Sequence, residues 1–473
     1  MTKERASVTP GMRVIAALPF ANQSRPEDSF LADALTELLI AELGKAGRLE
    51  IISWNSTRHY RNTDRPWNHI ARQLGAEGII SGSLARTGDF FRIQAAPINP
   101  KAAGPVWRRG FRREIHRLPE VLRSIVKDIA RETGSGLTPA EKRRLSRGPE
   151  WGGPALESYW SALHAWNELS EEGFKEAITR LLECLRRDPE FAPAYARLAF
   201  CYSSLGLWGL LPAGQAYPRA RLAAQKAIEL DASLTLAHYA LSLVLWLFDW
   251  EGEAAETHME KALVLNPSLA EARWARALYL ASTRRCFDAA TAEINRAIDL
   301  DPSSPLYTSS AGWISYWARR ADDAIERFWE AIEADGRLVS AWQGLGLAYL
   351  LKGKCSDAVN ALERAAAVAG DPYSLGMLGA AYATAGEADG ARAQLEAFQT
   401  AGAVAPPSLP QAWIWIGLGD KARAIELLHA AVEEHDVQLF WMGTAPLYDP
   451  LREEPGFQEL LRKISKQQTG HRS

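Results

Sequence analysis

Apolar positions between residues 341 and 368 follow a helical period in two consecutive stripes. The stripes comprise Trp342, Leu345, Gly346 and Tyr349 in the first half, and Ala358, Leu362 and Ala365 in the second. Spacings of three and four residues put each set on one face of a helix, because a helix turns once in about 3.6 residues. Each face must be buried, so the pattern predicts two helices packed against each other.

The same phrase recurs upstream. Alanines in KAIELDA, KALVLNP, RAIDLDP, EAIEADG and the 341–368 stretch lie at Ala227, Ala262, Ala297, Ala331 and Ala365, separated by 35, 35, 34 and 34 residues. A period near 34 is the tetratricopeptide (TPR) signature, and the stretch resembles a TPR repeat almost position by position. The resemblance implies an all-α superhelix (α-solenoid) of about eight helical hairpins over residues 155–438.

The glycines of this stretch resemble a phosphate-binding loop at first sight, because GLG is followed by GK. A phosphate-binding loop requires GxxxxGK followed by Ser or Thr, but Ala348 lies five residues before Gly353, and Cys355 follows Lys354. Gly346 and Ala358 are better explained as small residues where the two helices approach most closely. The pattern therefore predicts helix packing in place of nucleotide binding.

Residues 12–133 alternate between strand-like and helix-like patterns and predict a small α/β domain of order β-α-β-α-β-β-β-α. The expected elements are strands at 12–20, 48–53 and 106–115, a hairpin at 77–98, and helices at 28–43, 66–75 and 118–133. Gly88 is expected in the turn of the hairpin.

Landmarks in this domain resemble the TolB-like (FlgO-like) amino-terminal domain that bacterial signalling proteins join to TPR arrays. They are Leu18, Pro19, Phe20, Asn22, Phe30, Ala32, Asp33, Leu35, Thr36, Ala71, Leu74, Gly75, Gly82, Ser83 and Trp107. The chain departs from the family pattern at Ile98-Asn99, which Pro97 precedes. In that family the pair usually follows a class III adenylate cyclase, a protein kinase or a winged-helix domain. Only MTKERASVTPG precedes the first strand here, so we expect the output domain to be lost or encoded separately.

We therefore predict a TolB-like domain at 12–133, a linker at 134–154, the TPR array at 155–438 and a capping segment at 439–466. Residues 1–150 contain 25 basic and 16 acidic residues, a net charge of +9, whereas the remainder carries −12. This asymmetry also favours two domains. The longest apolar run, LSLVLWLF, is too short to span a membrane. We expect a cytoplasmic protein.

Motifs that carry chemistry are not found in the sequence. The four cysteines and nine histidines show no metal-ligand spacing, and no nucleophile elbow or dinucleotide fingerprint occurs. We therefore predict no catalytic residue, cofactor or metal. Arg108, Arg109, Arg112 and Arg113 could contact phosphates, but an alternating strand would point them to both faces. A solvated strand edge is the preferred interpretation, and nucleic acid is not expected as a partner.

In TPR arrays the first helices line a concave surface, and the resemblance implies a partner-binding groove there. Our predicted groove residues are Tyr239, Trp246, Trp274, Trp313, Tyr316, Trp317 and Gln343. Aromatic rings supply much of the binding energy at protein interfaces, although these rings could instead pack between repeats. We predict a non-catalytic scaffold or regulatory protein that binds a partner peptide or domain. The alternatives are the regulatory part of a nucleotide cyclase or winged-helix regulator, and small-molecule binding by the amino-terminal domain.

Overall fold

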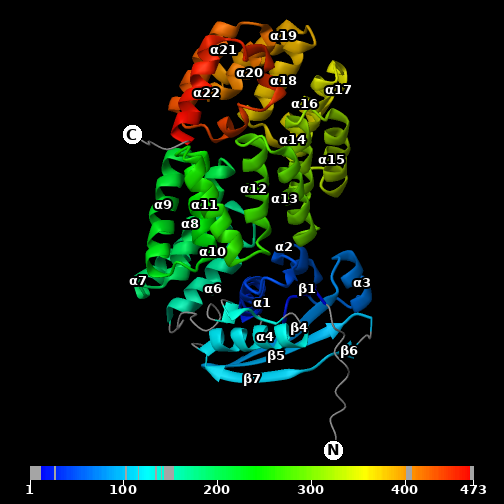
Figure 1. Cartoon of the computed structure of the whole chain (residues 1–473), viewed down its shortest axis with the longest axis vertical. Coiled ribbons are helices and arrows are strands. Elements are labelled where there is room, and N and C mark those ends of the chain that lie inside the picture. The colour runs from blue at the N-terminus through cyan, green and yellow to red at the C-terminus, as the bar shows by residue number, and fades with distance from the viewer. Residues whose placement is uncertain are drawn as a thin grey trace, which may run out of the picture.

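A computed structural model describes residues 12–25, 28–101, 104–114, 117–133, 136–139, 141–142, 154–400 and 407–468. It confirms the predicted fold class, since a small α/β domain precedes an all-α solenoid (Figure 1). Most of the predicted linker, 134–154, lies outside the described residues. No helix in the described part of the chain has the length and apolarity needed to cross a bilayer.

The amino-terminal domain contains a seven-stranded sheet in the order β3-β1-β4-β5-β6, with β2 paired to β4 and β7 paired to β5. The strands are β1 (Val14–Ala17), β2 (Ala21–Asn22), β3 (Glu50–Ile51), β4 (Gly78–Thr87), β5 (Phe90–Asn99), β6 (Gly104–Pro105) and β7 (Arg109–Glu114). Strand β1 runs parallel to β3 and β4, and the predicted hairpin forms the antiparallel pair β4–β5. Gly88 adopts a φ of 59° in its turn, a conformation that glycine tolerates best.

Helices cover both faces of this sheet. They are α1 (Ser29–Gly44), α2 (Trp54–Thr57), the 3-10 helix η2 (Arg58–Tyr60), α3 (Trp67–Gln73) and α4 (Leu118–Glu132). Strand alternation sends Ile15 and Ala17 into the core with α1 and α4, and Ala16 and Leu18 into the smaller core with α3. Helix α2 was not predicted, because its four residues are too few to show a helical period.

Several residues that carry the family resemblance join β1 to α1. The Thr36 hydroxyl accepts the backbone N–H of Phe20 at 3.0 Å and donates to the carbonyl of Ala32 at 2.8 Å. Gly82 lies beside the same aromatic ring, where a Cβ atom would come within 2.3 Å of Phe20. Glycine is therefore required at this position for steric reasons.

The array consists of consecutive helix pairs from α6/α7 to α20/α21. Their bounds are α6 (Pro154–Trp166), α7 (Glu171–Arg187), α8 (Ala192–Leu207), α9 (Ala213–Leu230), α10 (Thr235–Leu247), α11 (Gly252–Leu265), α12 (Ala270–Ser282), α13 (Phe287–Leu300), α14 (Pro305–Trp317), α15 (Ala321–Ala334), α16 (Val339–Leu351), α17 (Cys355–Ala369), α18 (Pro372–Thr384), α19 (Ala388–Thr400), α20 (Ser408–Leu418) and α21 (Lys421–Glu433). Two 3-10 helices, η4 (Val437–Trp441) and η5 (Pro446–Leu451), and helix α22 (Pro455–Gln468) follow.

Small residues set the distance between helices in the array. The five repeating alanines are all fully buried. Phe328 of α15 is also fully buried, and it packs against Gly312 of α14 and Gly344 of α16, where added Cβ atoms would lie 2.7 and 2.2 Å from its ring. The large ring and the two glycines therefore compensate for one another in volume.

The amino-terminal domain is packed directly on the array. Leu35 and Leu39 of α1 share one hydrophobic core with Trp160 and Leu163 of α6. Figure 1 shows the domain at one end of the molecule, with α2 close to the lower ends of α12 and α13. The two units thus form one continuous body in which buried apolar side chains cross the boundary.

Hydrogen bonds also join the amino-terminal domain to turns between later repeats of the array. The N–H of Ser53 donates to Leu300 O at 2.8 Å, and the N–H of Ile51 donates to Ser268 Oγ at 3.1 Å. The hydroxyl of Ser56 donates to the buried carboxylate of Asp301. Asp301 lies in the turn between α13 and α14, so this turn also binds the amino-terminal domain.

We expect Gly346→Ala to lower the free energy of unfolding by about 1–3 kcal/mol, because the new Cβ atom would lie 2.4 Å from Leu362 Cγ in the partner helix. Urea denaturation followed by circular dichroism measures this change. Gly214→Ala is the matched control, since a Cβ atom there meets nothing within 4 Å. Equal stability of the two variants would contradict the close-approach explanation.

Candidate binding site on the concave surface

The inner helices of the array surround a cavity of about 640 Å³. Five of the seven predicted groove residues line it: Trp246, Trp274, Trp313, Trp317 and Gln343. The other two, Tyr239 and Tyr316, are buried at 3% and 2% exposure and are not among the lining residues. Their rings pack between helices, which is the alternative that the sequence left open.

The tryptophans of the cavity are held by hydrogen bonds from their indole N–H groups. Trp274 donates to Ser310 Oγ at 2.8 Å, Trp246 to Thr283 Oγ1 at 3.1 Å and Trp313 to Ser340 O at 3.1 Å. Each of these acceptors belongs to the next repeat, so the bonds fix the ring orientation from one inner helix to the next. The buried indole N–H of Trp317 has no hydrogen-bond partner among the described residues.

The carboxyl-terminal segment contributes a wall of the cavity that was not predicted from the sequence. After α21 the chain returns along the concave side, and Phe440 and Trp441 join the tryptophans of the cavity. The Phe440 ring lies 5.1 Å from Trp246 and 5.8 Å from Trp317, and Trp441 lies 6.1 Å from Trp313. The available signal was the aromatic pair in QLFWM, directly after the last repeat.

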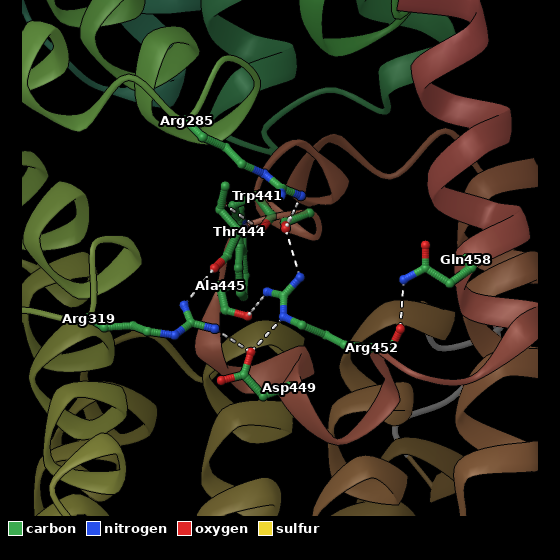
Figure 2. Close-up of polar contacts among 9 residues, drawn as sticks. Arg285, Arg319, Trp441, Thr444, Ala445, Asp449, Arg452 and Gln458 are labelled. Atoms are coloured by element: carbon green, nitrogen blue, oxygen red, sulfur yellow. Dashed lines mark hydrogen bonds and ion pairs between the residues drawn. The ribbon is translucent and has the colours of Figure 1, made fainter.

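Three arginines hold this segment in place (Figure 2). Arg285 donates to Gly443 O at 2.8 Å, and Arg319 reaches Asp449 Oδ1 at 2.6 Å. Arg452 donates to Gly443 O at 2.9 Å, to Ala445 O at 3.1 Å and to the same Asp449 oxygen at 2.7 Å. The guanidinium groups of Arg285 and Arg452 therefore bind main-chain carbonyls at the connection between η4 and η5, where the Ala445 carbonyl also accepts the N–H of Tyr448 at 3.2 Å.

Asp436 marks the point where the chain enters the concave side. Its carboxylate accepts the N–H of Gln438 at 2.8 Å and the hydroxyl of Tyr373 at 3.1 Å. Burial raises the pKa of Asp436 to about 6. We expected residues 439–466 to cap the last hairpin. In the structure α22 packs on α21 and on α11, whereas residues 437–451 run along the inner helices.

The remaining features noted in the sequence are the potential metal ligands and the arginine cluster of β7. Within the described residues no group of three His, Cys, Asp or Glu side chains is arranged to hold a metal ion. Arg109 of β7 pairs with the buried Asp128 of α4, and Arg112 stacks on Phe90 at 5.1 Å. Arg109 and Arg112 thus contact different elements, as expected for side chains that alternate along a strand.

Two histidines form an unpredicted pair between α10 and α11. His238 and His258 stack with their Nδ1 atoms 2.9 Å apart, and His238 Nε2 lies 3.1 Å from Ala232 O. A carbonyl only accepts, so His238 carries its proton on Nε2 and accepts from the Nδ1–H of His258. Burial lowers the pKa of both imidazoles.

Comparisons with known proteins give partial matches. No family model matches the chain. It is 32% identical over 250 residues to the putative adenylate cyclase 3 of Rhizobium meliloti, covering 50% of this chain and 41% of that protein. It is 22% identical over 321 residues to the transcriptional regulator HilA of Salmonella typhimurium, covering 67% of this chain and 56% of HilA. The chain thus spans about half the length of these relatives.

Solved structures with similar helical repeats include the type IV pilus biogenesis factor PilW, at 16% identity and a TM-score of 0.36 over 42% of this chain and 92% of PilW. The APC/C hetero-tetramer Cut9-Hcn1 gives 15% identity and a TM-score of 0.45 over 73% of this chain and 63% of that chain. Neither likeness is close enough to indicate a function.

We expect Arg452→Ala to lower the free energy of unfolding by about 1–3 kcal/mol, because it removes three hydrogen bonds to the carboxyl-terminal segment. Tryptophan fluorescence should shift at the same time, since Trp441 lies just before Gly443 and Ala445, whose carbonyls Arg452 binds. Arg327→Ala is the control, because that arginine is exposed and pairs with Glu330 on the surface of the same helix. Equal effects in the two variants would show that the arginines do not hold the segment.

The histidine pair predicts a pH dependence of stability. Its contribution is complete above about pH 6.5, the pKa of histidine in an unfolded chain, and is lost as the pH falls below it, because only the unfolded state gains protons readily. Asp436 and Glu271, with pKa values raised by burial to about 6 and about 7, act in the opposite direction.

A comparison of variants isolates the pair from these carboxyl groups. Urea midpoints between pH 7.5 and pH 5 should fall less steeply for the double variant His238→Leu, His258→Leu than for the natural chain. Parallel pH profiles would contradict the lowered pKa values.

Proposed function

We propose that this chain is a non-catalytic scaffold or regulatory protein that binds a protein partner through the cavity on its concave surface. The observation that carries the proposal is the cavity itself, which combines aromatic walls with a volume of about 640 Å³. Sites of about 300–1,000 Å³ enclose most of a bound group, and aromatic walls favour an apolar or aromatic anchor.

The carboxyl-terminal segment indicates what chemistry this surface accepts. Phe440 inserts between Trp246 and Trp317, at centroid separations of 5.1 and 5.8 Å with nearly perpendicular rings. Edge-to-face packing of this kind is favourable for aromatic side chains. The partner is therefore a peptide segment or loop that presents an aromatic residue to the cavity beside Phe440.

Polar groups surround the opening and would orient such a segment. Asp335 and Arg337 are exposed on the turn before α16, and Gln343 and Asp371 lie further along the same lining. The Gln343 amide donates to Ser374 Oγ at 2.9 Å, which leaves its carbonyl oxygen available to a backbone N–H of the partner. A polar border around an apolar centre is typical of protein interfaces.

A second candidate is the regulatory part of a cyclase or a transcription regulator whose output domain lies on another polypeptide. Two relatives named for different functions, a putative adenylate cyclase and the transcriptional regulator HilA, favour it, because this chain matches about half of each. A region shared by proteins with different outputs is better suited to regulation than to chemistry. For this second candidate, the protein partner is the polypeptide that carries the output domain.

Site-directed crosslinking tests the proposal. A photoreactive amino acid at position 343 should capture a partner, whereas the same group at Val368, which is 40% exposed and does not line the cavity, should not. The captured protein is then purified and titrated against the chain. Trp313→Ala should weaken its binding at least tenfold with no loss of helical circular dichroism.

Trp329→Ala is the matched control, because this tryptophan is 41% exposed on α15 and does not line the cavity. Unchanged affinity of the Trp313→Ala variant, or equal capture at the two crosslinking positions, would refute the concave site. A captured protein that contains a cyclase or DNA-binding domain would favour the second candidate.

A further inference from the structure

A second cavity, of about 180 Å³, lies where the amino-terminal domain meets the array. Its walls come from α1 and the loop after β3 on one side, and from α6, α8 and the turns before α10 and α12 on the other. The volume exceeds the roughly 10–15 Å³ needed by one water and is below the roughly 300 Å³ of sites for drug-sized ligands. It is separate from the concave cavity and suits a small molecule.

Three side chains that line this cavity carry a buried polar atom with no hydrogen-bond partner among the described residues. The atoms are Trp54 Nε1, Arg197 Nε and Thr235 Oγ1. Trp54 and Thr235 are only 8% and 9% exposed. Each unpaired buried group costs about 1–3 kcal/mol, so three around one cavity indicate a missing partner. Two are N–H donors, which require an acceptor such as a carboxylate.

Charged groups in the same lining are not balanced. Glu37 pairs with Arg197 at 2.7 Å, and Glu42 pairs with Lys45. Glu271 is a third lining carboxylate, and no salt bridge to it is formed within the described residues. Burial, with smaller contributions from Asp301 and Glu37, raises the pKa of Glu271 to about 7. Glu271 is half-buried, and the two cations of the lining, Arg197 and Lys45, are paired with Glu37 and Glu42, so Glu271 is the lining carboxylate that a bound cation would pair with.

The remaining surface of the cavity is apolar. Leu38 of α1 and Phe200 of α8 face it from the two sides, and Leu234 and Leu269 lie on the turns of the array. A ligand that satisfies the whole lining therefore needs three parts: an acceptor group, a cationic group and a short apolar group.

We propose that this interdomain cavity binds a free α-amino acid with an apolar side chain. The ammonium group pairs with Glu271, and the carboxylate accepts hydrogen bonds from Trp54 and Arg197. The Thr235 hydroxyl adds a further donor, and the side chain packs among the leucines and Phe200. Because the walls come from both units, the ligand stabilises the domain in its position on the array.

Thermal unfolding and calorimetric titration of the full chain test this assignment. L-leucine and L-phenylalanine are the probes, each compared with its decarboxylated amine and its deaminated acid. The amino acids should raise the melting temperature, and the amine or acid alone should bind at least tenfold more weakly. Binding should tighten from pH 6 to pH 8 as Glu271 ionises, with Glu37, Glu42, Asp301, Arg197, Lys45 and Tyr159 as the other titratable groups around it.

Variants locate the site. Glu271→Gln and Thr235→Val should each reduce affinity for L-leucine or L-phenylalanine at least threefold, with the larger loss for Glu271→Gln. Glu260→Gln and Thr257→Val change the same residue types outside the cavity lining and should bind as the natural chain does. If Glu271→Gln fails to fold, the Thr235 pair and the comparison of probes still decide the outcome.

The proposal is overturned if neither amino acid raises the melting temperature, which would leave water as the occupant. It is also overturned if an amine or acid alone binds as tightly as the amino acid, or if all four variants bind alike. None of these results depends on whether the concave surface binds a protein partner.

Discussion

The helix pairs of the described array have apolar side chains on two faces, and inside the array neighbouring pairs cover both. Inside the array the fully buried alanines let consecutive pairs approach closely. Among the described residues α6/α7 and α20/α21 are the outermost pairs, and an uncovered face at either one would expose a large apolar surface. The first and last pairs therefore determine what else the chain must contain.

The two ends meet this requirement differently. At the beginning, the core of the α/β domain continues into α6, so that Leu39 and Trp160 belong to one cluster. At the end, α22 covers α21 while residues 437–451 turn inward. The inward segment converts an open concave groove into a bounded cavity, because Phe440 and Trp441 supply a wall that the repeats alone do not have.

The sequence predicted the features that repeat. The spacing of Ala262, Ala297 and Ala331 indicated helix pairs, and the inner-helix register located Trp274 and Trp313, which line the cavity. It could not predict contacts that occur once. Ser56 and Asp301 are 245 residues apart. Ser56 lies in the four-residue helix α2 and Asp301 in a short turn, and neither is long enough to show a periodic pattern, so the sequence does not predict their hydrogen bond. Tyr239 and Tyr316 have the same register as the cavity tryptophans, and only their neighbours in space decide that they are buried.

The turn at Asp301 also limits how this array can evolve. Open solenoids can gain or lose whole repeats, because each unit touches only the next. Here one turn between pairs is bound to the amino-terminal domain, and Phe440 reaches back to Trp246 across several pairs. Insertion or deletion of a helix pair between Trp246 and Asp301 would displace both the contact of Trp246 with Phe440 and the contact of Asp301 with the amino-terminal domain. These two long-range contacts thus restrict the number of repeats, and related sequences should diverge by substitution within the helix pairs.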